Sequence, residues 1–358
     1  MSSPPPATDS LFAMTQSKPS ARRPAQQRLT VAVTGPTGEI GMPFVRALER
    51  SASVGSIRAL ARRPFDPSEL GWSKTEYRRG DILDRAAVDE LVAGSDVVVH
   101  LAFIVVQASA GSRDVNIEGS RNVFDATVAA GVPRLVYTSS VAAYGYHDDS
   151  AGMLTEDMAA RGTDRHAYST QKAEVERVLR EALDAASTGA YVFRPCIVAG
   201  PDARMLLEQL PYTRLGRRLP RLVRRALGLA PLVRPVLPDH GVRFQLVHHD
   251  DVATALLAAV RGRGRPGVYN LAAPGEVTIS DIAAELGWYS IPVPRRTVEV
   301  TARVLAHVPG LATEAGWLEA MRVPVLMDTT RAHDELGWRP AYDSLQTLHD
   351  MVAGQPRD

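Results

Sequence analysis

The sequence predicts an α/β fold, with a doubly wound parallel sheet and a smaller, mostly helical lobe at the carboxyl edge of its strands. Two observations support this. A short apolar, β-branched run at 29–34 leads directly into a glycine-rich turn, and apolar runs then alternate with helical patterns as far as about residue 200. After Pro201 the alternation stops, and residues 202–240 are dense in Leu, Pro and Arg.

Each expected element depends on its own pattern. Short apolar runs predict strands at 29–34, 56–60, 96–101, 135–138 and 191–193, and sheet-like sequence returns at 243–248 and 267–272. Helical periodicity predicts helices at 39–50, 86–93, 116–130 and 168–186. Strands that alternate with helices pair in parallel, and the helices cover both faces of the sheet.

The chain is expected to divide into three parts. Residues 1–28 are rich in Pro, Ser, Ala and Arg without an apolar stretch of signal-peptide length, which predicts a disordered leader. Residues 29–201 together with 241–275 form the sheet domain. Residues 202–240 together with 276–345 form the lobe and the C-terminal segment, and residues 276–325 have helical texture and prolines. We expect this lobe to bind the substrate, because open α/β sheets bind ligands at the carboxyl ends of their strands.

Composition narrows the classes of function. The 358 residues are 45 % hydrophobic and carry a net charge of +1, so nothing calls for a nucleic-acid partner. Cys196 is the one cysteine, which excludes a disulfide framework or a cysteine-based zinc site within one chain. No apolar run is long enough to span a bilayer, and a cytoplasmic location is expected.

The glycine turn predicts a dinucleotide site. Gly35, Gly38 and Gly41 follow the first strand at the spacing G-x-x-G-x-x-G. Glycine allows a tight turn, a close approach of the backbone to a pyrophosphate, and close packing of the helix on the strand. The helix N-terminus then offers free N–H groups to the phosphates. The alternative is a glycine-rich loop without a ligand.

The end of the second strand bears on the choice of nicotinamide cofactor. A site for NAD usually has an acidic residue there, on the ribose 2′-hydroxyl. This strand ends instead in Arg62 and Arg63. Guanidinium groups suit the 2′-phosphate of NADP, so we expect NADP(H) rather than NAD(H). An ordinary solvated arginine pair is the alternative.

Tyr168 and Lys172 are candidates for proton transfer. They are four residues apart on an expected helix and therefore share one face. A nearby ammonium group favours the phenolate, so we expect the pKa of Tyr168 to be lowered toward neutrality. Lys172 is one of only three lysines among 41 basic residues. Ser139 and Ser140 close the strand at 135–138, where a hydroxyl can hold a substrate oxygen.

These residues, in this order, resemble the extended short-chain dehydrogenase/reductase family, which includes NAD-dependent epimerases and dehydratases. The resemblance covers about residues 30–345 and is carried by short motifs: Thr34–Gly41, Gly80–Asp84, His100–Ala102, Asn116–Gly119, Ser139–Gly145, Tyr168–Lys172, Arg194–Pro195 with Gly200–Pro201, His248–Val252, Tyr269–Ala272 and Leu336–Pro340.

The resemblance implies a Rossmann-type domain and assigns roles to residues. Counting back from Gly145 makes Ser140 the active-site hydroxyl, beside Tyr168 and Lys172, with Asn116 supporting the proton network. The cofactor would contact Tyr168 and Lys172 and the following residues: Gly35, Thr37, Gly38, Glu39, Ile40, Gly41, Arg62, Arg63, Asp81, Ile82, Leu101 and Ala102. The resemblance also implies a homodimer that pairs through the helices at 116–130 and 168–186.

Three departures from the family pattern narrow the range of expected reactions and substrates. Val141 and Ala142 stand where the sugar dehydratases have an acid pair, which disfavours dehydration. Phe244 stands where nucleotide-sugar epimerases have a diphosphate-binding arginine, and Arg243 is offset by one residue, which turns a strand side chain to the other face. The loop at 103–106 is apolar and is either core or the wall of an apolar pocket.

Two further segments concentrate charged or metal-ligating side chains. The six arginines within Arg214–Arg225 are compatible with a solvated face, a phosphate or coenzyme A clamp, or contact with an anionic membrane. We favour the solvated face. The run His248–Asp251 is expected to be structural and to hold no metal, since consecutive side chains of one extended segment cannot all reach one ion.

The expected function is an NADP(H)-dependent oxidoreductase that interconverts a carbonyl and a secondary alcohol on a small, partly apolar molecule. The first alternative is an epimerase of nucleotide sugars that retains NAD. The second is a dinucleotide-binding scaffold or sensor without catalysis, which is disfavoured because the chain keeps both Tyr168 and Lys172.

Overall fold

A seven-stranded parallel sheet forms the centre of the molecule. The computed structural model describes residues 28–105, 111–147, 152–164, 166–203, 205–209, 234–294 and 323–354. The strands of the sheet lie in the order β10-β6-β5-β4-β1-β2-β3. They are β1 (Leu29–Thr34), β2 (Val54–Ala61), β3 (Thr75–Arg79), β4 (Val97–His100), β5 (Arg134–Thr138), β6 (Gly189–Pro195) and β10 (Gly267–Leu271). The strand order reverses between β1 and β4, and such a reversal opens a ligand crevice at the carboxyl ends of the strands.

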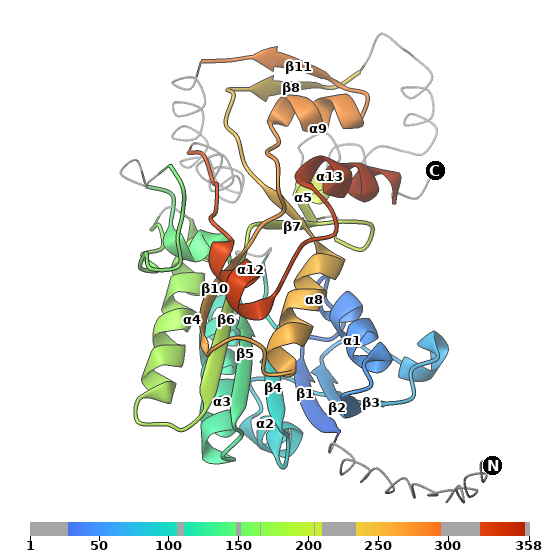
Figure 1. The fold of residues 1–358 in the computed structure, drawn as a ribbon, viewed down its shortest axis with the longest axis vertical. Coiled ribbons are helices and arrows are strands. Elements are labelled where there is room, and N and C mark those ends of the chain that lie inside the picture. Colours follow the sequence, from blue (N-terminus) through green and yellow to red (C-terminus); the bar gives the residue numbers. More distant parts are fainter. Residues whose placement is uncertain are drawn as a thin grey trace, which may run out of the picture.

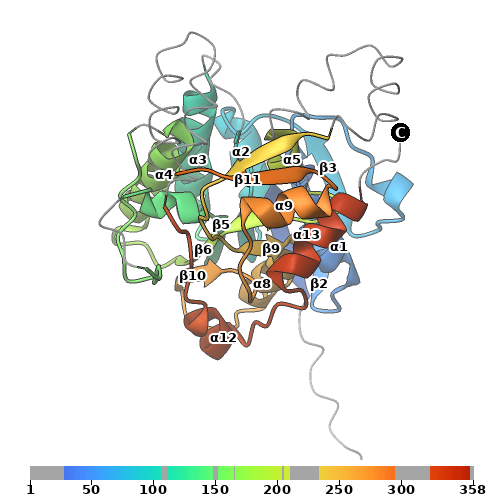
Figure 2. The ribbon, with the colours of Figure 1, turned by 90° about the horizontal axis from the view of Figure 1, so that it is seen from above.

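Helices cover both faces of the sheet (Figures 1 and 2). One face carries α1 (Gly41–Arg50) and α8 (His249–Val260), and the other carries α2 (Arg85–Val92), α3 (Ser112–Ala129) and α4 (Ala167–Leu183). Each face has its own buried apolar layer. Central strands such as β4 are buried on both sides, which explains the continuous Val97-Val-Val run where a half-exposed strand would alternate.

Smaller elements lie above the carboxyl ends of the strands (Figure 1). Two pairs of short parallel strands are present, β7 (Ile197–Ala199) with β9 (Leu246–His248), and β8 (Val236–Asp239) with β11 (Tyr289–Pro292). Among the described residues, the helices of this region are α5 (Met205–Gln209), α9 (Ile279–Glu285) and α13 (Ser344–Ala353). Helix α12 (Thr330–Leu336) packs against β10 and α8, and the 3₁₀ turns are η1 (Pro67–Leu70), beside β3, and η2 (Val141–Tyr144), after β5. A third buried cluster joins α9 and α13 to β9.

Most expected elements are present, and the exceptions have physical reasons. The expected strands and helices of the sheet domain coincide with β1, β2, β4, β5, β6 and β10 and with α1 to α4, apart from shifted ends. β3 was missed because Thr75–Arg79 is a polar edge strand. Helical structure throughout 276–325 was wrong at Tyr289–Pro292, where backbone pairing with β8 forms a strand.

Two expectations fall outside the described residues: the disordered leader, except for Arg28, and the stretch Arg214–Arg225. Within the described residues, no helix combines the length and the apolar character needed to cross a membrane.

Candidate active site

A cavity of about 720 Å³ lies at the carboxyl ends of the central strands. Its lining includes every predicted cofactor-binding residue together with Ser140, Tyr168 and Lys172. These residues come from segments up to about 140 positions apart in the sequence, and the parallel sheet brings them to one edge. Asn116 is the one predicted site residue that does not line the cavity.

The glycine turn forms one end of the cavity, and its shape depends on two of the three glycines. Gly35 has a φ of +73°, and a Cβ added to it would lie 2.7 Å from the backbone nitrogen of Ala102. A Cβ on Gly41 would lie 2.2 Å from the carbonyl oxygen of Gly35. For Gly38 the nearest atom would be 3.5 Å away, which is an ordinary contact. Gly35 and Gly41 are therefore required by the turn itself. Gly38 is not, and it lines the cavity, where a ligand can approach its backbone.

Arg62 and Arg63 follow β2 directly and are exposed at the rim of this end. An Nη of Arg63 donates to the carbonyl oxygen of Thr37 at 2.8 Å, which ties the end of β2 to the glycine turn. The backbone oxygen of Arg62 accepts from Nε of Arg79 at 3.2 Å, and that of Arg63 accepts from the Tyr77 hydroxyl at 2.6 Å. The arginine pair is therefore held beside the turn by neighbouring strands.

The remaining predicted cofactor residues line the same half of the cavity. Asp81 lies after β3, where a carboxylate oxygen accepts from the Leu83 backbone N–H at 3.0 Å. Ile82 is buried. Leu101 and Ala102 follow β4, and the Ala102 N–H donates to the Thr34 hydroxyl at 3.4 Å.

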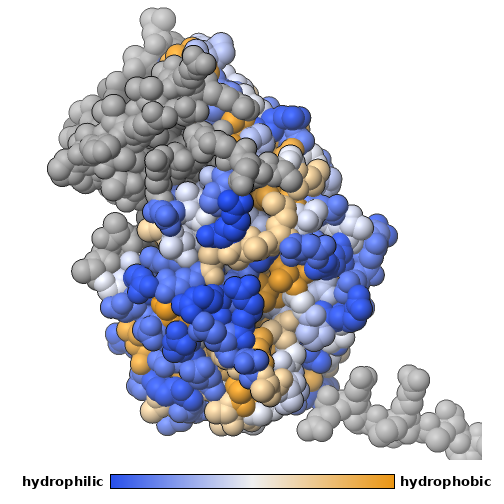
Figure 3. Space-filling view, turned by 90° about the vertical axis from the view of Figure 1, so that its left-hand side faces the viewer, coloured by the Kyte–Doolittle hydropathy of each residue, from blue (hydrophilic) through white to orange (hydrophobic). Residues whose placement is uncertain are grey.

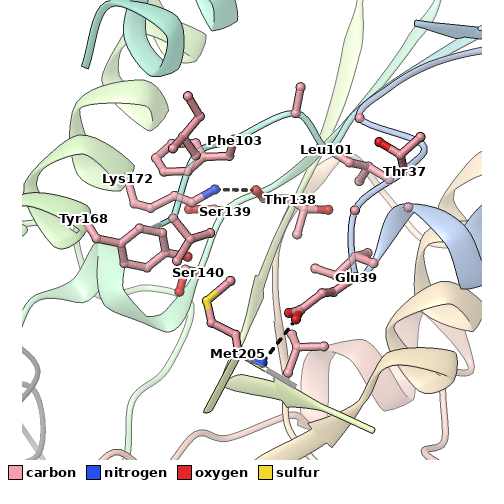
Figure 4. Close-up of a pocket in the computed structure, with 18 of the residues that line it drawn as sticks. Thr37, Glu39, Leu101, Phe103, Thr138, Ser139, Ser140, Tyr168, Lys172 and Met205 are labelled. Carbon is pink, nitrogen blue, oxygen red and sulfur yellow. Dashed lines mark hydrogen bonds between the residues drawn. The ribbon is translucent and has the colours of Figure 1, made fainter. Parts of the chain in front are cut away.

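Glu39 differs from these residues because it reaches out of the turn. Its carboxylate accepts from the backbone N–H of Met205 at 3.1 Å (Figure 4). The turn is therefore linked directly to α5 at the opposite wall.

Tyr168 and Ser140 form the other end of the cavity (Figure 4). Tyr168 lies in the first turn of α4, which is capped by the side chain of His166. Desolvation raises the pKa of the Tyr168 hydroxyl to about 12, and its hydrogen bond with Ser140 acts in the opposite direction. The expected lowering of the Tyr168 pKa is therefore absent in the structure, because burial outweighs the influence of neighbouring groups.

Lys172 is buried one turn further along α4. Its Nζ donates to the carbonyl oxygen of Thr138 at 2.9 Å and lies 3.4 Å from the Tyr137 hydroxyl. The same nitrogen lies 3.7 Å from the centroid of the Phe103 ring. Burial lowers the pKa of Lys172 to about 7, and the carboxylate of Glu176 partly opposes this.

Asn116 is fully buried in α3, behind the cavity wall. Its amide oxygen accepts from the Ile104 N–H at 2.8 Å, and its nitrogen donates to the Ile104 carbonyl at 3.0 Å. The nitrogen also donates to the side-chain oxygen of Gln171 at 2.7 Å. Asn116 thus fastens the loop after β4 to α4.

A buried ionic network behind the site was not predicted. Glu176 accepts from Nε and an Nη of Arg194 at 2.9 and 2.6 Å and from the Ser139 hydroxyl at 2.6 Å. The Arg194 guanidinium in turn stacks over the ring of Tyr144. The sequence signal was the position of Glu176 four residues after Lys172, on the same helix face. The network also separates the two serines, since Ser139 faces Glu176 and Ser140 faces Tyr168.

The segment His248–Asp251 is a strand–helix junction, not one extended run. His248 ends β9 and caps α8 by accepting from the Asp250 N–H at 3.2 Å, whereas the Asp251 carboxylate accepts from the N–H groups of Ala341 and Tyr342 at 2.8 and 3.2 Å. Potential ligand atoms of His248, His249 and Asp250 lie within 4.8 Å of one another. Three of the four side chains therefore come together, whereas the Asp251 carboxylate is directed to residues 341 and 342.

Both histidines of this junction already use one ring nitrogen as an acceptor. Nδ1 of His248 receives the Asp250 N–H, and Nε2 of His249 receives the Asp202 N–H at 3.4 Å. Such a nitrogen carries no proton, so in the neutral ring the proton sits on the other nitrogen, which then cannot coordinate a metal. The contacts support a structural role.

The residues that depart from the family pattern can be located in the structure. Val141 and Ala142 are buried in η2, directly after Ser140. Phe244 is 5 % exposed within the third apolar cluster. Arg243 points to solvent and pairs with Glu276 at 2.9 Å, so it does not face the cavity. Phe103 packs against Tyr168, and many other residues of the cavity lining are apolar: Ile104, Val105, Val115, Val141, Ile197, Val198 and Leu206.

Comparisons with known proteins agree with this geometry. An uncharacterised protein of Sinorhizobium fredii is 28 % identical over 330 residues, which cover 89 % of this chain and 76 % of the relative. A 3β-hydroxysteroid dehydrogenase/decarboxylase of Arabidopsis thaliana is 27 % identical over 299 residues, covering 75 % and 50 %. An uncharacterised Mycobacterium tuberculosis protein is 29 % identical over 332 residues, and this chain spans only 30 % of its length.

A solved structure and a family pattern complete the comparison. The NAD complex of UDP-glucuronic acid 4-epimerase from Bacillus cereus has a similar fold, with a TM-score of 0.67 at 17 % identity, covering 91 % of this chain and 98 % of the other. The pattern that defines the NAD dependent epimerase/dehydratase family matches residues 31–272. The chain therefore belongs to the NAD dependent epimerase/dehydratase family.

Proposed function

We propose that the protein is an NADP(H)-dependent oxidoreductase that interconverts a carbonyl and a secondary alcohol on a small, partly apolar substrate. One observation carries this proposal. A single cavity joins a rim with Arg62 and Arg63 at one end to Tyr168 within an apolar wall at the other. The first end suits a 2′-phosphate, and the second suits an uncharged carbonyl compound.

The lining residues fit a nicotinamide dinucleotide. The cavity beside Gly38 and the start of α1 would receive the pyrophosphate, and Arg62 with Arg63 would receive the 2′-phosphate. Lys172 and Tyr168 would contact the nicotinamide half. A bound nicotinamide would supply or accept the hydride.

The chain's own groups would handle the proton and the substrate oxygen. Ser140 would donate a hydrogen bond to that oxygen, and the Tyr168 hydroxyl would give it a proton during reduction or remove one during oxidation. The Lys172 ammonium and the cationic oxidised cofactor would both lower the pKa of Tyr168 and so oppose the effect of burial. Val141 and Ala142 supply no acid for the elimination of water.

The substrate would be enclosed by the lobe, assigned to residues 202–240 and 276–345. We also propose a homodimer through α3 and α4. Figure 3 shows the face that carries α4, where hydrophilic residues gather. Arg113 pairs with Glu174 at 2.6 Å there, which would make such an interface polar.

The test is a titration of the purified protein with NADPH and NADH, followed by a panel of carbonyl compounds with absorbance of NADPH as the readout. Selective, reversible binding of NADPH and its oxidation by apolar ketones or aldehydes are expected. Equal or tighter binding of NADH would exclude the cofactor preference, and the absence of turnover across the panel would exclude the reductase.

Epimerisation of a nucleotide sugar with retained NAD is the second candidate. The match to the NAD dependent epimerase/dehydratase family favours it. Against it, Arg243 points away from the cavity and Phe244 is buried. NAD released on denaturation of freshly purified protein would favour the epimerase.

A further inference from the structure

The side chain of Phe103 lies against both residues proposed for proton transfer. Its ring centroid lies 3.7 Å from Nζ of Lys172 and 5.5 Å from the ring centroid of Tyr168, with an interplanar angle of 88°. Figure 4 shows Lys172 between these two rings. The loop at 103–106 was expected to be either core or pocket wall, and the half-buried Phe103 lines the cavity.

The backbone beside Phe103 is fixed from behind. Asn116 binds both the N–H and the carbonyl of Ile104, the next residue, and is itself completely buried. Its third hydrogen bond, to Gln171, connects this clamp to the residue immediately before Lys172. The position of the Phe103 ring relative to Lys172 is therefore set by α3 and α4 together.

Few groups stabilise charge on Lys172. Tyr168 and Glu176 face it from its own helix, Tyr137 and the Thr138 carbonyl from β5, and the neutral His100 from β4. Among these described neighbours only Glu176 is charged, and Arg194 and Ser139 already occupy its oxygens. The face of an aromatic ring attracts a cation directly, which an aliphatic side chain of similar size does not.

We propose that Phe103 is a positioning residue for Lys172. The face of the Phe103 ring keeps the Lys172 ammonium charged and directed toward Tyr168 and the cofactor. The inference depends on the proposed function only for the role of Lys172. Replacement by leucine would keep an apolar cover but remove the ring face, so the charged form would lose stability. Tyrosine would keep the ring.

The scarcity of lysine allows a direct test. The chain has only Lys18, Lys74 and Lys172, so full-length protein labelled with ¹³C at lysine Cε should give three NMR signals, and K172M assigns the third. A pH titration then reports Lys172 without any substrate. In F103L its midpoint should fall by about half to one pH unit. F103Y should titrate like the wild type.

The control removes an aromatic ring elsewhere. Tyr289 is 55 % exposed on β11, and its ring lies 6.0 Å from the Arg234 guanidinium, so Y289L removes a comparable contact outside the site. Y289L should leave the Lys172 midpoint unchanged. Coincident titrations of F103L and the wild type, or an equal shift in F103Y, would overturn the proposal. If F103L shifts as expected but the wild type binds neither NADPH nor NADH, the proposed function fails and the positioning role stands.

Discussion

The two ends of the cavity are built in different ways. At the glycine turn the backbone itself forms the site, and a Cβ on Gly35 or Gly41 would meet main-chain atoms at 2.7 or 2.2 Å. At the other end side chains form the site, and Lys172 is only 3 % exposed. The glycine turn itself is a seven-residue stretch that packs on the end of β4, whereas the second end needs β4, β5, α3 and α4 in place. The close fit of backbone atoms therefore determines which residues the turn accepts, whereas desolvation determines the pKa values of the side chains at the proton-transfer end.

The strongest test of the proton-transfer end is Y168F. Loss of the hydroxyl should lower turnover of a carbonyl substrate by about 10²- to 10⁴-fold, because a positioned acid or base contributes that much. The affinity for NADPH should stay within roughly twofold, since the turn end is untouched. Stopped-flow turnover and a binding titration measure the two quantities. Turnover that persists within tenfold of the wild type would mean that another group moves the proton.

At the turn end, G41A and G38A form a matched pair. G41A should lower the free energy of unfolding by about 1–3 kcal/mol, because the added methyl group overlaps the backbone of residue 35. G38A should leave stability nearly unchanged and weaken only dinucleotide binding. Urea unfolding and NADPH titration separate these effects. Equal loss of stability in both variants would contradict the assignment of Gly41 to the structure of the turn and of Gly38 to dinucleotide binding.

The pH dependence of stability tests the burial of Lys172. Its pKa is lowered to about 7 from an ordinary value of 10.5, so between these values the unfolded chain binds more protons than the folded one. Wild-type stability should therefore rise relative to K172M across this window, by at most about 1.4 kcal/mol per pH unit. Below pH 7 the difference should stay constant. A difference that is flat up to pH 10 would show that the ammonium is solvated.

The smallest expected effect is on cofactor selectivity. R62A should weaken NADPH binding by about tenfold while leaving NADH unchanged, because an exposed guanidinium contributes modestly to binding of the 2′-phosphate. R265A, at an 86 % exposed side chain paired with Glu335, is the control for loss of charge. Parallel loss of NADPH and NADH affinity would assign Arg62 a different contact.

Sequence alone was most informative where the chemistry is local. The turn at Gly35–Gly41 and the pair Tyr168–Lys172 are short motifs, and the structure brings them to one cavity. It was least informative about electrostatics. Burial raises the pKa of Tyr168, and the spacing of residues along the chain does not reveal that burial. The contact of Glu176 with Arg194 and the histidine junction at β9 also depend on elements that meet only in three dimensions.

The order of the strands also bears on how the chain is synthesised. β10 completes the sheet by pairing with β6, yet Gly267 leaves the ribosome long after Pro195. At about 5–20 residues per second, the roughly 70 intervening residues take several seconds to emerge. For that interval the hydrogen-bonding groups along Gly189–Pro195 form an unpaired, largely apolar edge that can recruit strands from other nascent chains. Until β10 is made, β6 is therefore the apolar edge at which nascent chains of this protein can associate.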